Sequence, residues 1–398
     1  MPEQEKVMTV TLMRSDLYDS LAYTGAYLQL PASQSEMQDA LERARVTGGQ
    51  PYQVVECFDS QGEYLEFIPE NPSLAELNFL AQRISSLGES ERLAFASRAA
   101  AEKTPDMKKL INITYNLKEI MIIAGLDNDK DLGKFYVDND MVEELREVPD
   151  KALKFLDYEK IGREYREAEQ GEFINGSYML NHNLDFEEVY DGVHLPEQPA
   201  AEDYVFKLLV CDGAFYPSDV DECTPLNLPA TEDEIARVLD EQNISDFDGC
   251  VVYKNESIIP QLNGLFSDYA DIEKIRLLAD RINELKGQGL MAKYKAVLEF
   301  TQCSGLDSAL DLAKNLDCFD FHPEMSGAAA YGKLALLKTS GLAPDDLVFK
   351  HLEFEKYGHE MMKQDGAATT PYGLVLRNGK ELVLEYSQPS REMRQQML

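Results

Sequence analysis

The sequence predicts an α+β protein built from two tandem copies of one elongated, acidic module. The motif LPASQSEMQDALERARV at residues 30–46 returns 198 positions later as LPATEDEIARVLDEQNI at residues 228–244. Residues 80–87 recur at the same offset, and LDYEKIGRE at residues 156–164 recurs at nearly that offset as LEFEKYGHE. Three blocks that match in the same order favour duplication of a whole module.

The repeat sets the expected domain boundaries. We place the first copy at residues 1–184, an acidic linker at 185–203, the second copy at 204–386 and a flexible tail at 387–398. The linker contains seven acidic residues and no basic one, a composition typical of an exposed connection.

Each copy is expected to open with a small antiparallel sheet and one helix. The segments rich in β-branched and aromatic residues, which predict strands, are 7–13, 23–30, 52–58 and 249–254. Ser33 with Glu36, and Thr231 with Glu234, have the spacing of a capping box, which predicts a helix start at the same place in both copies.

Helical segments are expected to follow, and a hairpin should close each copy. Ser73 and Glu76 form a third candidate capping box before an apolar face of helical spacing. Asn175-Gly176 and Asn378-Gly379 are typical of tight hairpin turns. The further predicted helices are residues 89–103, 139–147, 151–168, 288–301, 306–316 and 345–363.

The charge is the strongest compositional signal. There are 72 acidic and 38 basic residues, a net charge of −34, and both halves share the excess with −19 in residues 1–200 and −15 in the remainder. Such a field repels nucleic acid and anionic membranes and attracts basic protein surfaces. Solubility alone is the simpler alternative explanation, but a charge this far from zero also has a cost in self-repulsion.

The remaining composition indicates a cytoplasmic protein. No apolar run is long enough to span a membrane, and the start lacks the pattern of a secretion signal. The six cysteines form no C-x-x-C pair and do not recur between the copies, so we expect reduced thiols without a metal site.

Motifs for catalysis are missing from the sequence. Phosphate-binding, dinucleotide-binding, nucleophile-elbow and zinc-protease patterns are all absent, and the five histidines are scattered. We therefore expect no enzymatic activity and no cofactor.

The acidic residues near the end of the first copy show more organisation. Carboxylates in staggered rows on an elongated body can approach the charge spacing of a DNA backbone, although a solvated helix face is the plainer interpretation of any single residue. The candidate phosphate mimics are Asp138, Asp140, Glu143, Glu144, Glu147, Asp157, Glu159, Glu164, Glu167, Glu169, Glu172, Asp185, Glu187 and Glu188.

The first copy also resembles a known family. SLAELNFLAQRISSL at residues 73–87 resembles the E-L-N-x-L helix of the ArdA antirestriction proteins, and residues 156–180 resemble their closing segment. The resemblance covers residues 7–183 and, in weaker form, 204–386. The family's usual G-x-W element has no Trp here, where Tyr27 stands near that place, and the E-L-N motif decays to Lys274-Ile275-Arg276 in the second copy.

The resemblance implies a DNA mimic encoded on a mobile element that occupies the DNA-binding groove of type I restriction-modification enzymes and binds no nucleic acid itself. The second copy would replace a dimer partner, which gives a pseudo-dimeric monomer, with a homodimer as the other possibility. An acidic inhibitor or adaptor of another basic nucleic-acid-handling protein, such as a CRISPR effector or a conjugation component, is the alternative. A third class, an enzyme of unknown type, would need a deep polar pocket.

Overall fold

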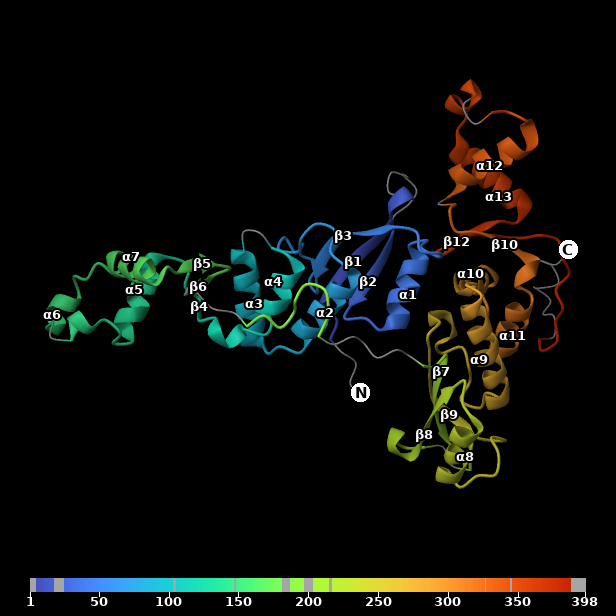
Figure 1. Ribbon diagram of the computed structural model, residues 1–398, viewed down its shortest axis with the longest axis horizontal. Coiled ribbons are helices and arrows are strands. Elements are labelled where there is room, and N and C mark those ends of the chain that lie inside the picture. Colours follow the sequence, from blue (N-terminus) through green and yellow to red (C-terminus); the bar gives the residue numbers. More distant parts are fainter. Residues whose placement is uncertain are drawn as a thin grey trace. The chain divides into compact units, whose positions relative to one another are not determined.

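The computed structural model describes residues 5–17, 25–102, 105–146, 148–180, 187–196, 203–214, 217–325, 327–343 and 346–387. It confirms the α+β class, with helices and four three-stranded sheets in the order β2-β1-β3, β4-β6-β5, β8-β7-β9 and β10-β12-β11 (Figure 1).

The two halves of the described chain follow the same order of elements. Each has two strands, a helix, a third strand, three helices, a short strand, a packed pair of helices and two closing strands. The first half comprises β1 Met8–Arg14, β2 Ala26–Leu30, α1 Gln34–Arg43, β3 Tyr52–Asp59, α2 Leu74–Ser85, α3 Glu89–Ala101, α4 Met107–Ile113, β4 Ile122–Ala124, α5 Asp129–Asp138, a short α6 Asp150–Leu153, α7 Tyr158–Glu169, β5 Glu172–Ile174 and β6 Ser177–Met179. The second comprises β7 Phe206–Cys211, β8 Thr224–Leu228, α8 Glu232–Glu241, β9 Val251–Ser257, α9 Ile272–Gly287, α10 Met291–Thr301, α11 Leu306–Lys314, β10 Phe319–His322, α12 Ala328–Ser340, α13 Phe354–Asp365, β11 Ala368–Thr370 and β12 Gly373–Arg377.

Contacts divide the chain into two compact units whose limits differ from the limits of the repeat. The first unit contains residues 1–11, 29–32 and 54–198. The second contains residues 12–28, 33–53 and 199–398. Helix α1, although it belongs to the first copy of the sequence repeat, is therefore part of the compact unit that holds the second copy.

In the first unit, the E-L-N residues of α2 are scaffold. Asn78 is 1% exposed, and its side-chain amide forms two hydrogen bonds with the backbone of Ala32, accepting from N–H at 2.6 Å and donating to the carbonyl at 2.9 Å. Leu77 is fully buried, and Glu76 accepts a hydrogen bond from the hydroxyl of Tyr190. The motif thus fixes α2 against the residues that follow β2.

Each copy contains a pair of helices packed at unusually close range. Helices α5 and α7 lie side by side, as do α12 and α13 (Figure 1). Glycines make this approach possible: a Cβ on Gly162 would lie 1.8 Å from the carbonyl oxygen of Asp129, and one on Gly358 would lie 1.7 Å from that of Ala328. These glycines occupy the recurring blocks at residues 156–164 and 352–360, so helix packing explains their presence.

The second unit has the larger described core. The sheet β8-β7-β9 packs with α9, α10 and α11 around residues such as Phe206, Leu278, Ile282 and Tyr294, all fully buried. A smaller cluster around Met325 and Tyr331 joins α12 to α13 and β12.

The cap predictions have mixed outcomes. The capping boxes at Ser33 and Thr231 are confirmed, with both reciprocal hydrogen bonds present in each. The capping box at Ser73 is wrong, because the Ser73 side chain makes no cap hydrogen bond. Glu76 points instead toward Tyr190, at 3.0 Å from its hydroxyl.

Several predicted helix limits are also wrong. The helix expected at 139–147 is absent. The chain leaves α5 after Asp138, Asp140 adopts a left-handed backbone with φ of 55°, and only a 3-10 turn at Glu143–Leu145 follows. The helix expected at 151–168 is divided into α6 and α7, because Asp157 caps a new helix start. The one expected at 345–363 becomes a 3-10 turn at Leu347–Lys350 and α13.

Of the two predicted hairpins, only the first is confirmed. Asn175 and Gly176 turn with positive φ between β5 and β6. The hairpin at Asn378-Gly379 is wrong: β12 pairs with β11 and β10. The chain after Gly379 forms no strand because side chains capture its backbone, with the N–H of Val383 donating to Asn315 and that of Glu385 to Asp311.

The expectation of six reduced cysteines is wrong for one pair. Cys211 and Cys223 form a disulfide with a Cα–Cα separation of 4.7 Å, because the antiparallel pairing of β7 with β8 places them side by side. Cys57, Cys250, Cys303 and Cys318 are free. Within the described parts of the chain, no helix combines the length and the apolar character needed to cross a membrane.

Candidate functional site

The candidate carboxylates of the first copy surround the α5–α7 helix pair. Those that the structure shows exposed are Asp138, Asp140, Glu143, Glu144, Asp157, Glu159, Glu164, Glu167, Glu172, Glu187 and Glu188. Glu147 and Asp185 lie outside the described residues. Most of the set therefore comes from one short region, α5 to β5, with Glu187 and Glu188 following after it in the chain.

Glu169 differs from the others because it is half-buried and structural. Its carboxylate accepts hydrogen bonds from the hydroxyls of Tyr136, at 2.7 Å, and Tyr178, also at 2.7 Å. Burial and the hydrogen bond to Glu169 raise the pKa of both tyrosines, so they remain protonated donors. Glu169 thus joins α7 to α5 and β6.

An ion pair inside the helix pair holds the exposed carboxylates in place. The guanidinium of Arg166 on α7 lies 2.6 Å from the carboxylate of Asp129 at the start of α5. The hydrogen bond from Arg166 lowers the pKa of Asp129, which therefore stays ionised. The aromatic rings of Tyr136 and Tyr165 stack at 4.3 Å between the same two helices.

Basic residues neutralise part of this acidic surface. Lys160 lies 3.9 Å from Glu164, and Arg163 lies 3.1 Å from Glu159, each within α7. Exposed pairs of this kind contribute only about 0–1 kcal/mol. Residues 129–179 contain 14 acidic and 8 basic residues, which leaves a net charge of −6.

The segment around Glu187 and Glu188 packs onto helix α4. The side-chain amide of Asn112 accepts from the N–H groups of Val189 and Tyr190 and donates to the carbonyl of Tyr190. Tyr190 is 2% exposed. These contacts hold part of the predicted exposed linker against the first unit while its two carboxylates stay exposed.

The equivalent helix pair in the second copy carries no net charge. Residues 328–377, from α12 to β12, contain 6 acidic and 6 basic residues, compared with the net charge of −6 in residues 129–179. Leu347 is 68% exposed between α12 and α13. The two copies therefore keep the same helix packing but present different surfaces.

The acidic excess of the second copy lies instead in its opening sheet and helix, which the candidate set omitted. Residues 203–257 contain 13 acidic and 3 basic residues, a net charge of −10, whereas the equivalent residues 5–59 contain 8 and 4. A count of charge by sub-region would have found this surface. All of its acidic residues are exposed: Asp203, Asp212, Asp219, Asp221, Glu222, Glu232, Asp233, Glu234, Asp240, Glu241, Asp246, Asp248 and Glu256.

The described residues hold no group of three or more histidine, cysteine or acidic side chains with the geometry of a metal site. Three of the histidines face a nearby carboxylate: His194 with Asp191, His322 with Glu324 and His359 with Glu355. The arrangement that stands out chemically is therefore a set of exposed carboxylates on and around a closely packed helix pair.

Comparison with protein families agrees with the resemblance seen in the sequence. Residues 17–180 match the family model of the antirestriction protein ArdA. This match confirms the resemblance for the first copy. No curated protein matches the chain.

Proposed function

We propose that the chain, whose residues 17–180 match the family model of the antirestriction protein ArdA, inhibits type I restriction-modification enzymes by occupying their DNA-binding groove. The observation that carries the proposal is the α5–α7 helix pair with its exposed carboxylates and net charge of −6. In this function the protein catalyses no reaction and needs no cofactor.

The spacing of the carboxylates supports mimicry of a phosphate backbone. Glu164 and Glu167 are three residues apart on α7, which separates them by about 4.5 Å along the helix axis. A DNA strand carries one charge per roughly 3.4 Å of axis. Lysine and arginine side chains that bind phosphates therefore find carboxylates at a comparable density.

The lysine and arginine side chains on this surface do not prevent its binding to a basic groove. Lys160 pairs with Glu164, and Arg163 pairs with Glu159, in ion pairs that are exposed to solvent. Since such pairs are weak and screened by salt, the basic residues of a target groove can replace them. Binding then releases condensed ions from both surfaces, as it does when the groove binds DNA.

The second copy contributes a different acidic surface, formed by β7, β8, α8 and β9. Its net charge of −10 over residues 203–257 extends the acidic area that one chain offers. The shared order of elements in both halves supports duplication of an ancestral module, and we propose that the second copy replaces a dimer partner. The mass of the protein in solution tests this part, because a stable dimer at low concentration would contradict it.

A competition experiment tests the function. A purified type I restriction-modification enzyme is bound to labelled DNA that contains its recognition site, and the protein is added at increasing concentration. The proposal predicts full displacement of the DNA, with an apparent inhibition constant that rises in proportion to the DNA concentration. Inhibition that does not respond to DNA concentration would contradict occupancy of the groove.

A variant series connects the result to the proposed site. D138N/D140N/E167Q removes three exposed carboxylates of the first helix pair, and E324Q/E353Q/E360Q removes three exposed ones in or next to the second. Both triple variants lose the same total charge. We expect the first to weaken displacement and the second to leave it nearly unchanged, and equal effects would assign binding to net charge instead of to this surface.

A further inference from the structure

Arg45, just after helix α1, inserts its side chain among backbone carbonyls of the second copy. Its guanidinium donates to the carbonyl oxygens of Met325 at 2.7 Å, Pro323 at 3.1 Å, Pro371 at 3.2 Å and Thr370 at 3.5 Å. The residue is 7% exposed. A buried guanidinium that is surrounded by carbonyl oxygens is well satisfied, because its N–H groups match several acceptors at once.

The backbone of Arg45 indicates that the side chain is what matters at this position. Arg45 has a left-handed φ of 64°, and Asn243, at the equivalent place in the second copy, has a φ of 54°. Asparagine tolerates this conformation, whereas arginine adopts it at a cost. The first copy accepts the less suitable residue at the same turn, and it gains the carbonyl contacts.

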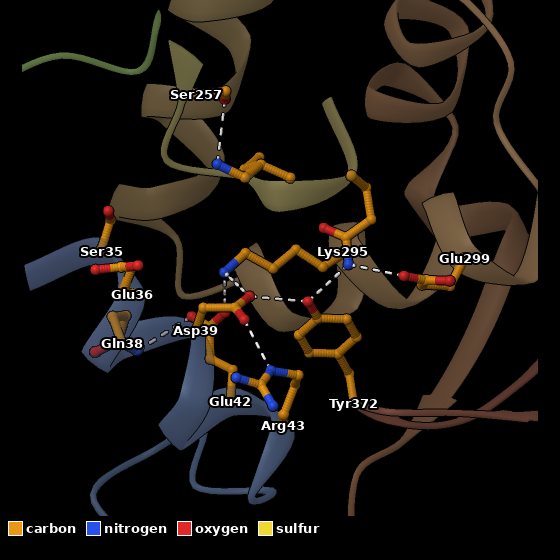
Figure 2. A network of polar contacts seen from close by, with 12 residues as sticks. Ser35, Glu36, Gln38, Asp39, Glu42, Arg43, Ser257, Lys295, Glu299 and Tyr372 are labelled. Atoms are coloured by element: carbon orange, nitrogen blue, oxygen red, sulfur yellow. Dashed lines mark hydrogen bonds and ion pairs between the residues drawn. The ribbon is translucent and has the colours of Figure 1, made fainter. Parts of the chain in front are cut away.

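A buried polar network makes the second contact of the same helix. The ammonium of Lys295 on α10 lies 2.8 Å from a carboxylate oxygen of Asp39 and 2.8 Å from one of Glu42, both on α1 (Figure 2). Lys295 is 2% exposed. The hydroxyl of Tyr372 donates to Asp39 at 2.8 Å from the opposite side (Figure 2).

The acceptors and donors on the second copy form a set that complements α1. This set, which we name the helix receptor, consists of Lys295, Tyr372 and the carbonyl groups of Pro323, Met325, Thr370 and Pro371. It offers a cation and a hydroxyl to two carboxylates, and carbonyl oxygens to a guanidinium. The matching groups are Asp39 and Glu42 on α1 and Arg45 just after it, spaced three residues apart.

Helix α8, the repeat of α1, lacks this pattern. The equivalents of Asp39 and Arg45 are Arg237 and Asn243, and Arg237 forms an exposed ion pair with Glu241 within α8. A helix with Arg237 would bring a cation to Lys295. The receptor therefore discriminates between the two repeated helices by charge.

We infer that the helix receptor is a recognition site for the D-x-x-E-x-x-R end of α1, and that it fixes the start of the first copy onto the second within one chain. The inference is independent of the antirestriction target, because every residue in it belongs to one compact unit of the protein. Asp39, Glu42 and Arg45 are positioning residues in this role.

The substitution Arg45→Asn separates docking from local helix formation. Asparagine suits the left-handed backbone better than arginine does. If Arg45 acted only on its own turn of backbone, the α1 amides of the variant would exchange hydrogen at an equal or slower rate in the full-length protein. Docking predicts exchange that is faster by about tenfold to a hundredfold, since hydrogen bonds to a charged group are lost. Unchanged or slower exchange in α1 would overturn the inference.

The converse substitution Asn243→Arg is the matched control. It places a left-handed arginine at the end of α8, where the receptor is not available, so it should speed exchange in α8 and leave α1 unchanged. A slowing of exchange in α8 would contradict the receptor's selectivity. The mass of the wild-type protein at the same concentration completes the test, because closure of the receptor by α1 from a second chain would give a dimer and overturn the single-chain assignment.

Discussion

Replacing Lys295 with methionine should destabilise the unit that contains the second copy. The substitution keeps the buried aliphatic volume but removes the cation that lies 2.8 Å from both Asp39 and Glu42. Removing one partner of a buried ion pair costs about 3–5 kcal/mol. Asp39 retains the guanidinium of Arg43 at 2.9 Å and the hydroxyl of Tyr372 at 2.8 Å, so we expect a loss near the lower limit, about 3 kcal/mol.

Urea denaturation of the full-length protein, monitored by hydrogen exchange of the α1 and α10 amides, measures this loss of stability. The triple variant D39N/E42Q/K295M should recover all but about 1 kcal/mol, because neutral residues carry no uncompensated buried charge. A loss below about 0.5 kcal/mol in the single variant would refute the reasoning, as would a triple variant that is no more stable than the single one.

The remaining predictions concern packing, capping, cysteine chemistry and pH. Gly162→Ala should destabilise the α5–α7 pair by about 1–3 kcal/mol in thermal unfolding, since the added Cβ would lie 1.8 Å from a carbonyl oxygen. Gly287→Ala is the control, because a Cβ at Gly287 would have no neighbouring atom within 4 Å, and it should be neutral or stabilising. Ser33→Ala should cost about 1 kcal/mol in the same measurement and Ser73→Ala much less, because of these two serines Ser33 alone makes a cap hydrogen bond. Equal losses would contradict the assignment of the caps. Denatured without reductant, the protein should show four reactive thiols in a colorimetric titration, and six would contradict the Cys211–Cys223 disulfide. Burial raises the pKa of Asp39, but Lys295 and Arg43 outweigh the effect of burial and hold the pKa below its ordinary 3.8. The stabilisation that the ionised carboxylate provides is therefore present above about pH 4 and is lost as the pH falls through the pKa of the folded state. Asp39→Asn should reduce this loss of stability in acid, measured by unfolding at a series of pH values.

Much of the fold could be predicted because the sequence repeats. The capping boxes at Ser33 and Thr231 depend on residues three apart, and such local hydrogen bonds can be read directly from the spacing. The turn at Asn175-Gly176 is predicted in the same way, because the two residues tolerate the positive φ that the turn requires.

Errors arose where long-range contacts override local preference. Asn378-Gly379 has the composition of a hairpin turn, but Asp311 and Asn315, more than sixty residues earlier in the chain, bind the backbone that would have formed the second strand. The disulfide depends on the pairing of β7 with β8. The contact between Lys295 and Asp39 joins residues 256 positions apart, and no local pattern indicates it.

The exposure of the candidate carboxylates could be predicted in part. Acidic residues at the surface follow from composition, and the candidates around α5 and α7 that the structure describes are exposed apart from Glu169, whose tyrosine partners come from different elements. The acidic surface of residues 203–257 was missed, because its carboxylates are spread over strands, turns and α8 instead of recurring along one helical segment.

The salt dependence of binding tests most directly whether these carboxylates replace DNA phosphates. The dissociation constant of the protein with a type I restriction-modification enzyme is measured across a range of salt concentrations for the wild type and for D138N/D140N/E167Q. We predict a steep linear dependence of log Kd on log salt concentration, as for DNA, with a slope reduced by about 3 in the variant, since each lost phosphate-like contact removes about 0.9. Binding that is insensitive to salt, or a slope that the three substitutions leave unchanged, would contradict the account.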